Sequence, residues 1–298
     1  MIRKFLLSNR FIRKSAVSMY DEYWKLIMQL FRFLPKSLGE EITNDIFSIA
    51  IVTYVERFES YFKPLIINLT ILFPDTQIVV GLNGFHDLEK QRNYLKDARL
   101  FLSKYKNITI IDFEEAQSLS KLWNLVIFNS VANKTLVLND DLRISPWFRK
   151  ELEKTGIIET EISLINRSWS HYLISKDIIK KVGWFDQRFP AMGNEDEDYE
   201  CRMVLKGVQK KVFEMKYVQN VVAIPETYSF GEHIDLINTK YPKANKIFFD
   251  SKWQLSETHE NGFQYIEMLK AYVKQRPGME TPNFYENENF IKNNSKIK

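Results

Sequence analysis

The feature that most constrains the fold is an alternation of short apolar segments with longer polar or amphipathic segments between residues 47 and 138. Strands are expected at residues 47–54, 77–82, 108–112 and 135–138, and helices at residues 58–72, 87–105 and 119–132. Strands that alternate with helices in this way indicate βαβ units and a parallel sheet. We therefore predict an α/β fold with a mostly parallel, Rossmann-like central sheet flanked by helices.

Composition favours one large folded unit with appendages. The chain has 298 residues, of which 45% are hydrophobic and 14% aromatic, enough for a sizeable core. A single cysteine, Cys201, excludes an internal disulfide framework and is typical of a reducing cytosol, so we expect a cytoplasmic protein. No apolar run reaches the roughly 18 residues of a membrane span, and no signal peptide is evident.

Positive charge is concentrated at the N-terminus. Residues 1–36 hold eight basic and two acidic side chains, a net +6 in a chain of net charge +4, so the remainder carries −2. This distribution argues against a nucleic-acid substrate. Trp24, Ile27, Phe31 and Leu34 recur at helical spacing, which predicts a basic amphipathic helix within an extension over residues 1–45. This helix either packs on the main domain or lies on an anionic membrane surface, at the inner face of the cell membrane.

Two acidic clusters carry the chemical signal. Asn139, Asp140 and Asp141 end a buried strand, and ligands of open α/β sheets bind at that edge. Adjacent carboxylates repel each other unless a cation neutralises them, and a hard divalent ion with oxygen ligands suits both them and a diphosphate. The second cluster, residues 195–198, opens a helix, where the unpaired N–H groups and the dipole favour negative charge.

The order of three motifs resembles the family 2-like glycosyltransferases of the A fold. These motifs are Asn-Asp-Asp at residues 139–141, Gly-Trp-Phe-Asp at residues 183–186 and Glu-Asp at residues 195–196. The resemblance covers residues 49–207 and implies a catalytic domain over residues 46–232, followed by a helical segment and flexible tail over residues 233–298. It also implies inverting transfer of a sugar from a nucleotide-sugar donor, expected to be a UDP-sugar, to a saccharide or lipid-linked saccharide in polysaccharide biosynthesis.

The resemblance also assigns residues to the donor and the metal. Asp141 would ligate Mn²⁺ or Mg²⁺, and Asn139 and Asp140 would face the ribose or sugar. His233, on a loop after the acidic helix, would complete the metal shell. The donor-binding residues expected in addition lie in the loops after the first two strands and in the helix before the metal strand: Thr53, Tyr54, Glu56, Asn83 and Asn124.

Asp196 is the expected general base, which takes the proton of the acceptor hydroxyl. Glu195 would bind the acceptor or orient the loop, Asp198 would brace the helix start, and Glu197 would be solvated. A lone base differs from the two opposed carboxylates of most glycoside hydrolases. His171 and Trp169 could form an acceptor-facing wall, although core packing is the stronger expectation for the tryptophan.

Two other functions remain open at this point. A sugar-phosphate nucleotidyltransferase shares the layered fold, but its first loop is normally rich in glycine, whereas residues 53–58 contain none. A non-catalytic carbohydrate-binding relative would not need Asp141 and Asp196, and both are present.

Overall fold

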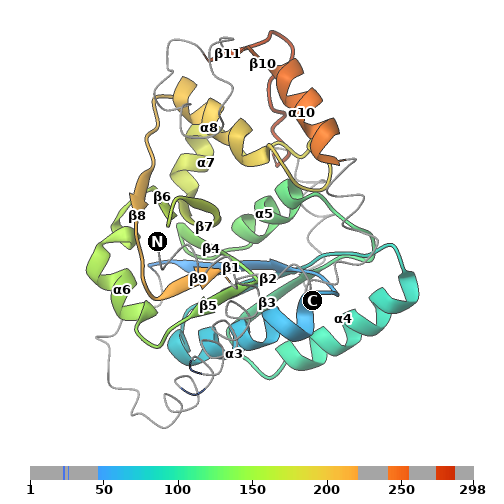
Figure 1. Cartoon of the computed structure of the whole chain (residues 1–298), viewed down its shortest axis with the longest axis vertical. Helices are drawn as coiled ribbons and strands as arrows, with labels where there is room; N and C mark the ends of the chain where they lie inside the picture. The colour runs from blue at the N-terminus through green and yellow to red at the C-terminus, as the bar shows by residue number, and fades with distance from the viewer. Residues whose placement is uncertain (1–22, 24–25, 27–45, 221–240, 255–272, 286–298) are drawn as a thin grey trace, which may run out of the picture.

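The structure is a computed structural model that describes residues 46–220, 241–254 and 273–285, together with Tyr23 and Leu26 (Figure 1). Apart from those two residues, the predicted N-terminal helix lies outside the described residues, as does His233. Within the described residues, no helix is long and apolar enough to cross a membrane.

A seven-stranded sheet forms the centre of the described chain, with strand order β3-β2-β1-β4-β7-β6-β8. Its strands are β1 (Ser48–Thr53), β2 (Ile78–Leu82), β3 (Ile108–Asp112), β4 (Lys134–Asn139), β6 (Ile162–Ile165), β7 (Ser168–Ser175) and β8 (Lys211–Phe213). The first four run parallel, while β7 runs antiparallel to both β4 and β6. The carboxyl ends of β1 to β4 therefore meet at one edge of the sheet.

Helices cover both faces of this sheet (Figure 1). One face packs against α3 (Lys63–Leu72), α4 (Leu88–Leu102) and α6 (Phe148–Thr155), and the other against α5 (Leu119–Phe128), α7 (Lys176–Val182) and α8 (Glu195–Leu205). Alternation along β1 separates the two cores, because Ile49 and Ile51 join the first and Ala50 joins the second. The predicted α/β class, with a mostly parallel central sheet flanked by helices, is confirmed.

All three predicted helices have different ends in the structure, and the one expected to reach residue 105 ends at Leu102. The helix expected from residue 58 opens as a π-helix, η1 (Phe58–Phe62), before α3, where Pro64 at the start lacks the N–H that a regular turn would use. The helix expected to reach residue 132 stops at Phe128, where the Asn129 and Ser130 side chains donate back to carbonyls of α5 at 2.8 and 2.9 Å.

The remaining elements extend this framework. A short 3₁₀ helix, η2 (Ile157–Glu159), follows α6, and β5 (Leu142–Ile144) pairs with β9 (Val218–Asn220). Near the C-terminus, α10 (Tyr241–Lys252) leads into β10 (Trp253–Gln254), which pairs with β11 (Lys274–Gln275). A third apolar cluster joins α10 to α8 through Phe249, Trp253 and the buried Cys201. The boundary proposed at residues 232 and 233 stays a prediction.

Candidate active site

Asp140 is the centre of the site at the carboxyl end of β4. It is buried, and each of its carboxylate oxygens accepts one hydrogen bond, from Thr53 Oγ1 at 2.8 Å and from Arg57 Nη1 at 2.7 Å. Burial raises the pKa of Asp140, and the Arg57 charge opposes that rise. The side chain of Asp140 is thus fixed by the loop that follows β1.

Asp141 accepts fewer side-chain hydrogen bonds than Asp140. It accepts a hydrogen bond from Asn139 Nδ2 at 2.8 Å and lies 3.4 Å from the Arg57 guanidinium. Among the described residues, no group of three or more His, Cys, Asp and Glu side chains is arranged to hold a metal ion. Mg²⁺ in proteins is commonly held by one or two carboxylates together with substrate phosphates, so Asp141 fits such an ion as a single protein ligand.

Arg57 is a site residue that the sequence analysis missed. Its guanidinium contacts both Asp140 and Asp141, and these two charges raise its pKa although burial opposes the rise. The only sequence signal was a basic residue four positions after Thr53. The contact depends on β1 and β4 being neighbours in the sheet, which the sequence does not state.

The other predicted donor residues of this loop lie beside Arg57. The Tyr54 ring is half-buried, with the Arg57 guanidinium carbon 5.9 Å from its centroid, and burial raises the pKa of its hydroxyl. Glu56 forms an ion pair with Lys90 of α4 at 3.3 Å. Together with Thr53, these residues line the carboxyl end of β1.

Asn83, after β2, organises the adjacent loop. Its Oδ1 accepts hydrogen bonds from the backbone N–H groups of Gly84 and Gln117, both at 2.8 Å, and its Nδ2 donates to the Gln117 carbonyl at 3.2 Å. Gly84 is required here because a Cβ atom would lie 2.0 Å from the backbone of Glu115. Asn83 therefore joins the loops after β2 and β3.

Asn124 has a different setting from the one expected. It is completely buried in α5, where its Nδ2 donates to the Phe185 carbonyl at 2.8 Å and its Oδ1 accepts from the Phe185 N–H at 2.9 Å. Both polar atoms of the amide thus hold the turn at residues 183–186. The structure places Asn124 as a link between that turn and α5, and a donor contact stays a prediction.

The loop before α8 is attached to the same edge of the sheet. The backbone N–H of Leu119, at the start of α5, donates to the Ala191 carbonyl at 2.7 Å. Leu119 lies two residues after Gln117, which Asn83 holds at the end of β2. This chain of contacts brings the start of α8, with Glu195 and Asp196, to the carboxyl edge of the sheet.

Glu195 and Asp196 are carboxylates that are largely shielded from solvent. Glu195 is buried and accepts a hydrogen bond from the Gly193 N–H, whereas Asp196 is half-buried and accepts one from the Glu197 N–H at 3.0 Å. Burial and the charge of Asp196 raise the pKa of Glu195 to about 8, and burial with the charge of Glu197 raises that of Asp196 to about 6. A carboxylate with a pKa near neutrality suits general base catalysis.

The next two acidic residues differ from each other. Asp198 is buried, accepts hydrogen bonds from Arg202 Nε and the Trp253 indole, both at 2.9 Å, and forms an ion pair with Lys252 at 2.6 Å, so it braces the start of α8. Glu197 was expected to be solvated, and that expectation is wrong. It is half-buried and accepts a hydrogen bond from the side chain of Asn194, the residue before the first turn of α8.

The aromatic and histidine candidates on β7 belong to the core. The Trp169 indole donates to Glu200 Oε1 at 2.6 Å and is buried against Tyr172 and Tyr199. His171 is buried, and burial lowers its pKa to about 4. The interpretation of His171 as an acceptor-facing wall is therefore wrong, because its ring does not reach the surface.

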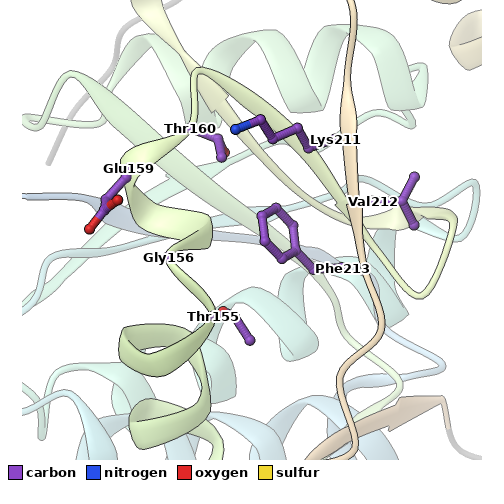
Figure 2. A pocket seen from close by; sticks show the side chains of 7 residues that line it. All are labelled: Thr155, Gly156, Glu159, Thr160, Lys211, Val212 and Phe213. Atoms are coloured by element: carbon purple, nitrogen blue, oxygen red, sulfur yellow. The ribbon is translucent and has the colours of Figure 1, made fainter.

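A separate cavity of about 580 Å³ lies at the outer edge of the sheet, between α6, η2 and β8 (Figure 2). It is lined by Thr155, Gly156, Glu159, Thr160, Lys211, Val212 and Phe213. Both threonine hydroxyls already donate to backbone carbonyls of their own segment. Because β8 is separated from β4 by two strands, this cavity is distinct from the candidate active site.

No family model matches this chain, and no curated protein sequence is similar to it. Among solved structures, it is similar to residues 1–349 of S. aureus TarS in complex with UDP, with 13% identity and a TM-score of 0.43 over 58% of this chain and 59% of that chain. The chain thus spans less than two thirds of that TarS fragment. It is also similar to the mannosyltransferase PcManGT from Pyrobaculum calidifontis, solved with GDP-Man and Mn²⁺, with 11% identity and a TM-score of 0.49 over 78% of this chain and 72% of that chain. Likenesses this remote do not assign an activity.

Proposed function

We propose that this chain is a nucleotide-sugar-dependent glycosyltransferase of the A type, similar to family 2. The observation that carries the proposal is that two acidic groups lie at the edge of the sheet where the parallel strands β1 to β4 end. One group, Asp140 and Asp141, is tied to the β1 loop by Thr53 and Arg57. The other, Glu195 and Asp196, opens a helix attached to that edge and has raised pKa values.

The first group suits the donor. The β1 and β2 loops, with Thr53, Tyr54, Glu56 and Asn83, would bind the nucleoside, and Asn139 and Asp140 would face the ribose or sugar. Asp141 would hold Mn²⁺ or Mg²⁺, which when bound supplies positive charge to stabilise the nucleoside diphosphate as it leaves. The proposed contribution of His233 to the metal shell belongs to a residue outside the described part of the chain.

The second group suits the acceptor. Asp196 would accept the proton of the acceptor hydroxyl as that oxygen attacks the anomeric carbon, and Glu195 would orient the acceptor beside it. A pKa of Asp196 near 6 leaves the side chain mostly ionised at neutral pH yet still basic enough to accept a proton. Attack from the face opposite the leaving group would invert the anomeric configuration.

For the acceptor we propose only a broad chemical class. We favour a saccharide or a lipid-linked saccharide of a surface polysaccharide, handled at the inner face of the cell membrane. The net charge of +6 in residues 1–36 supports this proposal, because basic segments are attracted to anionic lipid.

Sedimentation of the full chain with anionic vesicles at low and high salt tests the membrane contact. Charge-driven binding should be present at low salt and lost at high salt, and binding that does not weaken at high salt would contradict it.

Calorimetry with UDP and GDP, with and without Mn²⁺, tests the donor site. We expect Mn²⁺ to strengthen nucleotide binding to the wild-type protein and Asp141→Ala to remove that gain. The control is Asp97→Ala, on the exposed face of α4, which should bind like the wild type. Slow hydrolysis of one UDP- or GDP-sugar from a panel would then identify the donor. Failure of every nucleotide to bind would refute the proposed function.

A further inference from the structure

The loop that presents Glu195 and Asp196 has an unusual backbone. Ala191, Gly193 and Asn194 have φ angles of 51°, 114° and 64°, which lie in the left-handed region. That region is uncommon for residues other than glycine, and such residues persist only where surrounding contacts hold them. The contacts that hold this loop therefore decide where the two carboxylates lie.

Asn245 of α10 supplies the most concentrated of these contacts. Its side chain is completely buried, and its Nδ2 donates to the carbonyl oxygens of Pro190 at 2.9 Å, Met192 at 3.0 Å and Gly193 at 2.8 Å. The reverse orientation of the amide would place its oxygen against three carbonyl oxygens, so the donor assignment is fixed by the surroundings. One side chain thus gathers three carbonyls of the loop.

The far end of α10 is attached to α8 itself. Lys252 Nζ, fully buried, contacts Asp186 Oδ2 at 2.7 Å and Asp198 Oδ1 at 2.6 Å. The neighbouring Trp253 indole donates to the same Asp198 oxygen at 2.9 Å. Figure 1 shows α10 lying beside α8 along the loop that precedes it. The helix is therefore joined both to the loop and to the first turn of α8.

From these contacts we infer that α10 is part of the catalytic unit and that Asn245 is the positioning residue for Glu195 and Asp196. Asn245 holds the carbonyls of the loop, the loop sets the first turn of α8, and that turn presents the base. The inference rests on the proposed function for its catalytic consequence. Asn245 would act through the loop whose carbonyls it holds.

Kinetics of Asn245→Ala test the catalytic consequence. A misplacement of about 1 Å can cost about 100-fold in rate, so we expect kcat to fall by about 10- to 100-fold. KM for the donor should stay within about twofold, because the donor site lies on other loops. The control, Asn93→Ala on the exposed face of α4, should leave both constants unchanged. A folded Asn245→Ala variant with wild-type kcat would overturn the inference.

Asn245→Asp gives a signature that a general loss of stability would not give. A carboxylate at this position would repel the three carbonyls, whereas a protonated carboxyl group can donate one hydrogen bond to them. The ratio of the activity of Asn245→Asp to that of Asn245→Ala should therefore rise as the pH is lowered from 8 to 6. Asn245→Ala is the reference because it lacks the same three hydrogen bonds at every pH. A flat ratio would count against the donor role.

Hydrogen exchange separates this inference from the proposed function. In Asn245→Ala, amides of residues 191–198 should exchange at least about tenfold faster, while those of α4 should be unchanged, because the opening is local. If the wild-type protein transferred no sugar, the proposed function would fail, and this exchange experiment would still decide whether Asn245 holds the loop. Unchanged exchange in residues 191–198 would refute the inference whatever the activity.

Discussion

Two pairs of carboxylates around the first turn of α8 differ in their ion pairing and in the direction of their pKa shifts. Asp186 and Asp198 share the buried Lys252, and hydrogen bonds from Arg188 and the charge of Lys252 overcome the effect of burial, so the pKa of Asp186 falls to about 2. Glu195 and Asp196 form no ion pair with any described residue, and burial raises their pKa values to about 8 and about 6.

The contrast shows how one short segment serves both stability and chemistry. A buried carboxylate with a cation is neutralised and holds elements together, as Asp198 holds α8 to α10. A buried carboxylate without one is costly to the fold, and its perturbed pKa is typical of a functional site. The predictions below test whether the two pairs differ as this comparison requires.

The largest effect is expected from Asp196→Asn. This change keeps the shape of the side chain but removes its ability to accept a proton, so turnover should fall by about 10²- to 10⁴-fold. Nucleotide binding, measured by calorimetry, should be unchanged. Asp97→Asn, at an exposed position on α4, is the matched control. Full activity in Asp196→Asn, or retention of anomeric configuration by NMR of the product, would show that the base lies elsewhere.

Removal of the cation that Asp186 and Asp198 share should lower the stability of the fold. Lys252→Met leaves Asp186 and Asp198 buried without their shared cation, which should lower the free energy of unfolding by about 3–5 kcal/mol. Urea unfolding measures this loss, and Lys243→Met, exposed on the same helix, is the control. A loss below about 1 kcal/mol would show that the ion pairs of Lys252 stabilise the protein no more than surface salt bridges usually do.

The rate should also depend on pH through Asp196, which forms no ion pair with any described residue. The groups that face Asp196 are Glu195, Glu197, Glu200 and Tyr172, and its pKa is about 6. Since the base must be ionised, kcat/KM should fall about tenfold per pH unit below that value. Circular dichroism at pH 5 would check that the fold is intact. A rate that is constant from pH 7 to pH 5 would be inconsistent with Asp196 as the base.

The sequence predicted what is local or periodic. The four parallel strands β1 to β4 follow from short apolar segments between helices, and Asp140 and Asp141 follow from their place at the end of one such strand. Arg57 and Lys252 were missed because their partners lie 83 and 66 positions away, so only the folded chain brings the charges together. Glu197 was misplaced for a related reason, because its partial burial and its hydrogen bond with Asn194 are properties of the folded chain that no periodicity predicts.

The smallest effect, and the one opposite in sign to Lys252→Met, is expected from Glu195→Gln. The pKa of Glu195 is raised from 4.5 to about 8, so the folded protein binds this proton more tightly than the unfolded chain does. Ionising the group therefore costs stability, increasingly as the pH rises from 4.5 to about 8, and a glutamine avoids that cost while its oxygen still accepts from the Gly193 N–H.

Glu195→Gln should consequently be more stable than the wild type by about 0.5–2 kcal/mol at pH 8, a gain of the size usual when a functional constraint is removed. The gain should shrink towards pH 4.5 and vanish below it, because the carboxyl group then becomes protonated in the unfolded chain as well as in the folded protein. Urea unfolding at pH 8 and at pH 5 measures both values, with Glu114→Gln at an exposed position as the control. If Glu195→Gln were less stable than the wild type at pH 8, the ionised carboxylate would be a structural acceptor, and the contrast with Asp198 would not hold.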